Sequence, residues 1–129
     1  MTDNALGSQG EAAVRSMLEC LFVDLDKMID HYSDDAIYHM VSWKQPVVGR
    51  DAIRAELEQL SRPMSDYRYT LRNIASTDAV VFIEVDDTFK YDGKDMTTHW
   101  SSVLEVNPSG KITAERDYYD MKEFEAQLA

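Results

Sequence analysis

The chain has 129 residues, which is enough for one domain with a single core, and its 44% hydrophobic content excludes a disordered protein. Its 24 acidic and 13 basic residues give a net charge of −11. Such a charge repels phosphate backbones and anionic lipid surfaces, so the composition argues against nucleic-acid and membrane partners.

The N-terminal quarter is expected to be helical. Residues 1–10 are small and polar and predict a flexible N-terminus, whereas residues 11–129 are expected to form one domain. From Glu11 onward apolar residues recur at helical spacing. Asp24 is placed to cap a second helix, whose apolar pattern runs on to Tyr32.

The middle of the chain predicts a short strand and a third helix. Ala36–Val41 has the composition of a strand, and a loop around Pro46 follows it. Gly49-Arg50-Asp51 then introduces apolar residues at helical spacing, and this third helix is expected to end near Pro63.

The second half is rich in β-branched and aromatic residues that alternate with polar ones. Asp92-Gly93 is a strong signal for a two-residue hairpin turn, and Asn107-Pro108-Ser109-Gly110 predicts another turn. Residues Met121–Leu128 are helical by composition. The expected strands are Tyr67–Ile74, Ala79–Tyr91, Met96–Val106 and Lys111–Asp120.

Helices followed by long antiparallel strands predict an α+β domain. The sheet is expected to curve, with the helices covering its concave face. This arrangement makes a cone with an internal pocket, a concavity of the kind in which small ligands bind.

Four motifs in this order resemble the limonene-1,2-epoxide hydrolase family, within the NTF2-like (SnoaL-like) superfamily. They are Asp35-Ala36-Ile37-Tyr38, Gly49-Arg50-Asp51-Ala52-Ile53, Gly110-Lys111-Ile112 and Glu115-Arg116-Asp117-Tyr118-Tyr119-Asp120. The resemblance covers roughly Val14 to Phe124, and the last motif is its most specific part. It implies a cofactor-independent enzyme on a cone-shaped scaffold.

The resemblance also implies roles for single residues. The family's base aspartate falls on Asp117, the partner aspartate on Asp87, and the tyrosine that helps to hold the attacking water on Tyr38. Two positions depart from the family pattern, because Val85 replaces an arginine and Met40 replaces an asparagine. Without the guanidinium and the amide, the carboxylates lose their link and the water loses a hydrogen-bonding partner.

The residues themselves support an acidic site. Alternation places Asp87 on the apolar face of its strand, where desolvation raises the pKa of a carboxyl group. If Asp117 shares that pocket, one aspartate can hold a proton while the other stays ionised, which gives an acid and a base together. The alternatives are that Asp87 is solvated beside its hairpin and that Asp117 pairs with Arg68 or Arg72. Tyr38 is either a donor to a substrate oxygen or an aromatic at the mouth of the cone.

The remaining large apolar side chains predict the lining of a pocket for a small hydrophobic ligand of the terpenoid, steroid or polyketide type. Taken singly, most of them are equally compatible with an ordinary core. The predicted lining comprises Met17, Met40, Trp43, Leu60, Met64, Tyr69, Val85, Phe89, Trp100, Tyr119 and Phe124.

Several further expectations concern what surrounds the domain. Alternation directs His39 and His99 away from the pocket, and with no metal-ligand spacing in the sequence neither a metal nor a cofactor is expected.

The single cysteine, Cys20, and the lack of a signal-like or membrane-spanning apolar segment predict a cytoplasmic protein. Apolar residues on the outward face of the sheet, Val80, Phe82 and Val103, predict a homodimer formed through the sheet.

Three functional hypotheses follow. The first is an epoxide hydrolase-like enzyme in which Asp117 activates water and Asp87 or Tyr38 protonates the epoxide oxygen. The second is an isomerase or cyclase of the ketosteroid isomerase or SnoaL type, in which Asp117 moves a proton on carbon. The third is a non-catalytic domain that binds a small molecule, because fold alone does not determine function.

Overall fold

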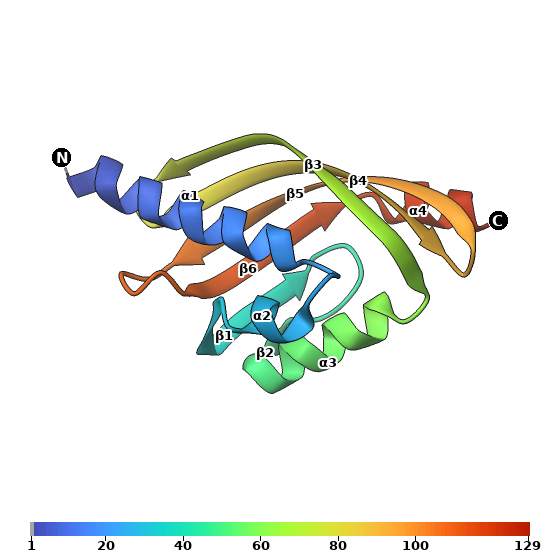
Figure 1. The fold of residues 1–129 in the computed structure, drawn as a ribbon, viewed down its shortest axis with the longest axis horizontal. Coiled ribbons are helices and arrows are strands. Elements are labelled where there is room, and N and C mark those ends of the chain that lie inside the picture. Colours follow the sequence, from blue (N-terminus) through green and yellow to red (C-terminus); the bar gives the residue numbers. More distant parts are fainter. Residues whose placement is uncertain (1) are drawn as a thin grey trace.

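The structure is a computed structural model that describes the backbone of residues 2–129 and the side chains of residues 9–129. The described residues form an α+β domain, as the sequence predicts (Figure 1). The helices are α1 (Thr2–Cys20), α2 (Leu25–Ile29), α3 (Arg50–Ser61) and α4 (Met121–Leu128). The strands are β1 (Tyr32–Met40), β2 (Val47–Val48), β3 (Met64–Thr77), β4 (Val80–Tyr91), β5 (Lys94–Val106) and β6 (Ile112–Tyr119).

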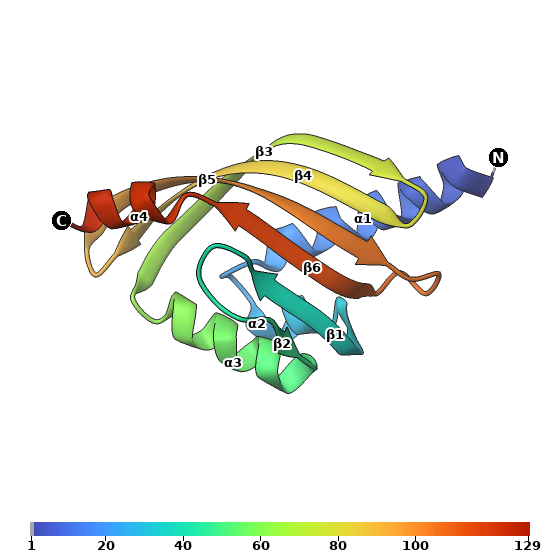
Figure 2. The same ribbon diagram turned by 180° about the vertical axis from the view of Figure 1, so that it is seen from behind.

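The six strands form one mixed sheet in the order β2-β1-β6-β5-β4-β3. The pairing of β1 with β6 is parallel, whereas all other neighbours are antiparallel. The sheet curves around α1, α2 and α3, and α4 lies at the opposite end from the N-terminus (Figures 1 and 2). The long strands β3, β4 and β5 form most of the curved wall, so the helices close a cone.

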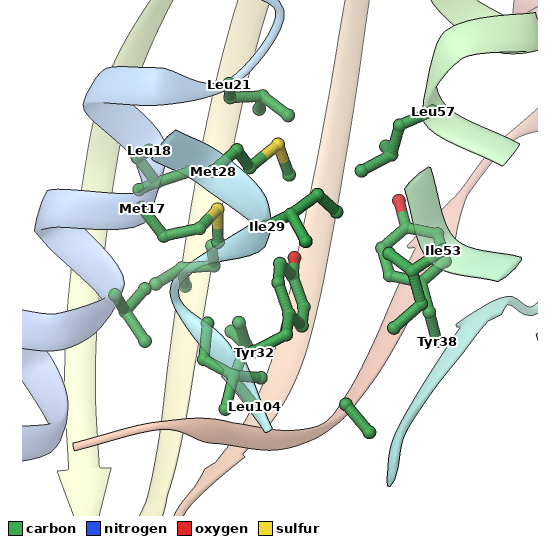
Figure 3. Packing of buried hydrophobic residues seen from close by; sticks show 14 of the residues in the cluster. Met17, Leu18, Leu21, Met28, Ile29, Tyr32, Tyr38, Ile53, Leu57 and Leu104 are labelled. Atoms are coloured by element: carbon green, nitrogen blue, oxygen red, sulfur yellow. The ribbon is translucent and has the colours of Figure 1, made fainter. Parts of the chain in front are cut away.

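The core fills the space between the helices and the concave face of the sheet. Met17 and Leu18 of α1, Met28 of α2, Tyr38 of β1 and Ile53 of α3 all belong to one buried cluster (Figure 3). On β4 the inward positions from Val81 to Phe89 are all buried, whereas Phe82, Glu84 and Thr88 between them are exposed. This period of two confirms the alternation expected for that strand.

Local signals place the turns and caps. Asp92 and Gly93 both have positive φ, 49° and 82°, as a two-residue turn between twisted strands requires. The Asp24 side chain accepts a hydrogen bond from the Lys27 amide at 3.1 Å and caps α2. In the same way Asp120 caps α4 through the amides of Lys122 and Glu123.

Several boundaries differ from the sequence-based prediction: β3 is longer at both ends, β2 lies within the predicted loop around Pro46, and the starts of α1 and β1 shift most. Helix α1 begins at Thr2 rather than at Glu11. Tyr32 opens β1 instead of ending the second helix, because the chain there pairs with Ile112 of β6. This pairing joins segments 80 residues apart, so helical spacing alone does not reveal it. Within the described residues, no helix is long and apolar enough to span a membrane.

Candidate functional site

A cavity opens between the concave face of the sheet, α1, α3 and α4, with about 820 Å³ of empty space when its open mouth is included. Concavities with mainly apolar walls and a few polar groups are the usual sites of small-molecule binding. Asp87, Asp117 and Tyr38 all line it, as do most of the residues predicted for its wall. The lining also includes residues that were not predicted, namely Leu21, Phe22, Tyr91, Thr98, Glu115 and Met121.

Two predicted wall residues lie outside this lining. Val85 is fully buried in the core behind the cavity. Tyr69 is half-buried and packs against the core from β3, with its ring 6.5 Å from that of Tyr67. Met40, which stands where the resemblance expects an asparagine, does line the cavity.

Asp117 is held at the cavity wall by two hydroxyl groups. Its carboxylate accepts hydrogen bonds from Tyr38 Oη at 2.8 Å and from Ser102 Oγ at 2.5 Å. The aspartate is only 8% exposed. The alternative pair with Arg68 or Arg72 does not form: Arg68 is exposed on the outer face of the sheet, and Arg72 binds Asp86 there at 2.6 Å.

A bulge orients Asp117 towards the cavity. Glu105 pairs with Ala114 but Val106 pairs with Ile112, so Thr113 is an extra residue on β6. The bulge brings Asp117 opposite Ser102, on the inner face. Without it, Asp117 would fall opposite Ser101, whose side chain is on the exposed face, because a one-residue slip turns every side chain over.

Glu115 completes the site, and the sequence-based reasoning missed it. It is 3% exposed and accepts a hydrogen bond from Tyr32 Oη at 2.6 Å. Its carboxyl group is also hydrogen-bonded to that of Asp117. The signal was present, because positions 115 and 117 of one strand share a face.

Burial determines the charge of this pair. Desolvation, the charge of Asp117 and the hydrogen bond between the two carboxyl groups raise the pKa of Glu115 well above its usual range. Desolvation also raises the pKa of Asp117, but the hydrogen bonds from Glu115, Ser102 and Tyr38 counter this effect. The two carboxyl groups therefore titrate as a pair, and the larger set of raising effects on Glu115 favours a proton on this member beside an ionised Asp117.

Asp87 occupies a second position along the same cavity. Its Oδ2 accepts hydrogen bonds from Tyr67 Oη at 2.8 Å and Trp100 Nε1 at 2.9 Å, and its Oδ1 accepts one from Thr98. Burial raises the pKa of Asp87, and these three hydrogen bonds counter that rise. Since an indole N–H can only donate, the arrangement fits an ionised carboxylate.

Asp87 and Asp117 do not form the close pair that was expected. Asp87 faces Thr98 across β5 and Asp117 faces Ser102, so the two positions are four residues apart along that strand. This offset corresponds to roughly 13 Å. The structure joins Asp117 to Glu115 instead, and Asp87 stands apart with its own hydrogen-bond donors.

One buried hydroxyl group at the cavity lacks a partner within residues 9–129. It is Tyr119 Oη, whose ring lines the cavity. His39 and His99 are directed away from the cavity, and His99 Nδ1 binds Asp86 at 2.6 Å on the outer face. Within residues 9–129, no group of three or more His, Cys, Asp or Glu side chains could hold a metal ion.

Together, the curved mixed sheet, the covering helices and the inner cavity define a cone-shaped domain of the class that binds small ligands. The chain belongs to the SnoaL-like domain family, whose family model matches residues 9–115. The match ends just before Asp117, so the final motif extends beyond it.

Solved structures show the same fold. An LEH-like epoxide hydrolase of M. tuberculosis is similar with a TM-score of 0.81 and 23% sequence identity, over 95% of this chain and 90% of that one. A protein of Shewanella denitrificans OS-217 that is described as a SnoaL-like polyketide cyclase has a TM-score of 0.82 at 15% identity. The match covers 92% of this chain and 96% of that one. A protein of Shewanella putrefaciens CN-32 with the same description has a TM-score of 0.82 at 18% identity, over 93% of this chain and 85% of that one.

Proposed function

We propose that this protein is a cofactor-independent acid–base enzyme, epoxide hydrolase-like, that acts on a small hydrophobic substrate. The observation that carries the proposal is the hydrogen-bonded pair of carboxyl groups, Glu115 and Asp117, at the wall of an apolar cavity. One member holds a proton and the other is ionised, so an acid and a base face the same space.

In the epoxide reaction, Asp117 takes a proton from a water molecule whose oxygen attacks a carbon of the ring. The carbon–oxygen bond of the epoxide breaks, and Glu115 gives its proton to the oxygen that leaves, which yields a diol. Asp117 then holds the proton taken from water, and Glu115 is ionised. A proton transfer along their hydrogen bond restores the starting state without an exchange with solvent.

Tyr38 and Ser102 position the base. Both donate to the Asp117 carboxylate, which fixes the direction of its free lone pairs and keeps it ionised. In this role Tyr38 acts through Asp117, and this assignment differs from the direct donor to a substrate oxygen considered from the sequence. Asp87 is not required as the acid, because three donors already surround it.

A second activity is supported by Met40 and Val85. These apolar side chains stand where the resemblance expects an asparagine and an arginine, so no amide is present at position 40 to hold a water molecule. Proton transfer on carbon needs no bound water. In an isomerase or cyclase, Asp117 would remove a proton next to a carbonyl group, and the protonated Glu115 would donate to the enolate oxygen.

Isotope incorporation separates the two reactions. A panel of terpenoid and styrene-type epoxides is incubated with the protein in oxygen-18 water, and the diols are analysed by mass spectrometry. Label in a diol supports the hydrolase if it is lost in Asp117→Asn. The control variant Glu125→Gln, on the exposed face of α4, should keep the label. Deuterium exchange into cyclic ketones with the same variant pattern supports the isomerase or cyclase.

The third hypothesis, a binding domain without catalysis, gives a different pattern. Neither label appears, although hydrophobic ligands bind the wild-type protein. If Asp117→Asn changes neither activity nor ligand affinity, the assignment of Asp117 as the base is wrong.

A further inference from the structure

The cavity combines negative charge with aromatic walls, and this combination is not used by the proposed reaction. Asp87, Glu115 and Asp117 line it, whereas no lysine, arginine or histidine of the described chain does. Eight of its 18 lining side chains are aromatic. A wall with acidic and aromatic side chains favours a substrate that is not a plain hydrocarbon.

The partners of the Asp87 carboxyl group among residues 9–129 are three neutral donors. Two donors converge on Oδ2 and a third reaches Oδ1, which fits the ionised form. His99 slightly lowers the pKa of Asp87, but that ring lies on the outer face and binds Asp86. A buried charge without an ionic partner is costly, so a cation in the cavity would relieve this cost.

Two aromatic side chains, Tyr67 and Trp100, contact Asp87 directly. The ring of Tyr67, whose hydroxyl binds Asp87, lies 4.9 Å from that of Phe22 and 6.3 Å from that of Phe89, measured between centroids. Trp100 binds the same carboxylate through its indole nitrogen. Faces of such rings attract cations, and alkylated ammonium groups suit them best because they are weakly hydrated.

We propose that the cavity binds hydrophobic amines, protonated or quaternary, with the ammonium group beside Asp87 and the apolar body directed towards Asp117. The offset of four residues between the two positions on β5, roughly 13 Å, leaves room for a ligand that spans them. The inference rests on the proposed function in taking this cavity as the substrate site, and it gives Asp87 the role of a binding residue.

A pair of probes with the same shape tests this preference. Phenethyltrimethylammonium and its neutral isostere, (3,3-dimethylbutyl)benzene, differ only in the nitrogen and its charge. Binding is followed by the fluorescence of Trp43 and Trp100, the two tryptophans of the chain, which both line the cavity. The wild-type protein is expected to bind the ammonium probe roughly 10–30-fold more tightly.

Substitutions of Asp87 test whether this residue causes the preference for the ammonium probe. In Asp87→Asn the ratio of the two affinities is expected to fall towards one, and Asp87→Glu is expected to restore part of it. Asp86→Asn is the matched control, because it removes a charge from the next residue, whose side chain binds Arg72 and His99 on the outer face. Equal affinities in the wild-type protein, or an unchanged ratio in Asp87→Asn, would overturn the proposal.

The two proposals can fail separately. Asp117→Asn is expected to abolish turnover while keeping most of the ammonium preference. If that variant stays active, the catalytic assignment is wrong but the preference at Asp87 still stands. If the wild-type protein binds the two probes equally, the proposal of an amine ligand is wrong, whereas turnover of neutral substrates by Asp117 is unaffected.

Discussion

Glu115 and Asp117 lie two residues apart on β6, and their carboxyl groups are hydrogen-bonded to each other inside the protein. Tyr32 and Tyr38, both from β1, each donate to one member of this pair. The parallel pairing of β1 with β6 brings these four side chains together from two distant parts of the chain. The arrangement predicts how stability and activity depend on pH.

Stability should fall as the pH rises above the ordinary range of a glutamate. The pKa of Glu115 is raised in the folded state, so the unfolded chain loses this proton first. Between the ordinary pKa, about 4.5, and the raised one, the folded state binds more protons, and the free energy of unfolding decreases. The slope reaches about 1.4 kcal/mol per pH unit for one proton.

Urea unfolding from pH 4.5 to pH 9 measures this slope. The Glu115→Gln variant removes the titrating group but keeps a donor towards Asp117. Its free energy of unfolding should therefore depend less steeply on pH. Equal slopes for the variant and the wild-type protein would contradict the location of the proton on Glu115.

The rate should depend on pH through both members of the pair. Activity is expected to rise as Asp117 ionises and to fall as Glu115 loses its proton, which gives a bell-shaped profile of kcat/KM. In Glu115→Gln the fall at higher pH should disappear, and the rate should drop by roughly 10²–10⁴-fold because the general acid is lost. A merely structural role for Glu115 would leave the shape of the profile unchanged.

Met40→Asn tests whether the missing amide limits hydration of epoxides. The residue lines the cavity and is paired with Asp117 in the register between β1 and β6. An asparagine there can donate to and accept from a water molecule beside the base. We expect faster formation of labelled diol and a loss of about 1–3 kcal/mol in unfolding free energy, because a buried methionine is replaced by a polar group.

Met64→Gln is the matched control, since it adds an amide elsewhere on the cavity wall. An increase in diol formation with both variants would show a general effect of polarity rather than a held water molecule. No increase with Met40→Asn would favour the isomerase or cyclase.

Much of this fold follows from local sequence. The Asp92-Gly93 turn, the α4 helix with its Asp120 cap and the inward face of β4 all depend on residues close together in the chain. Patterns of this kind determine local geometry directly. The α+β cone could therefore be predicted from the order and spacing of the elements.

The site was harder to predict because it depends on register. Alternation alone suggests that Asp87 and Asp117 share one face, but their offset along β5 follows from the pairing of three strands and from the bulge at Thr113. The sequence does not single out Glu115, because acidic residues at alternate positions of a strand are commonly solvated. Only the pairing of β6 between β1 and β5 shows that both carboxyl groups are buried.

The predicted homodimer concerns the opposite face of the sheet. Phe82 on β4 and Tyr118 on β6 are 43% and 45% exposed, and Val103 of β5 lies beside Phe82 in the register. Large apolar side chains grouped on an exposed face favour association. We expect the wild-type protein to elute as a dimer in size-exclusion chromatography with light scattering, and Phe82→Glu to shift it to a monomer.

The control variant is Val23→Glu, at an apolar residue that is 74% exposed in the turn between α1 and α2, away from the sheet. It should leave the oligomeric state unchanged. A monomeric wild-type protein, or a dimer that survives Phe82→Glu but not Val23→Glu, would place the interface elsewhere. Because Phe82 points away from the cavity, the monomeric variant should also keep the ligand affinity of the wild-type protein.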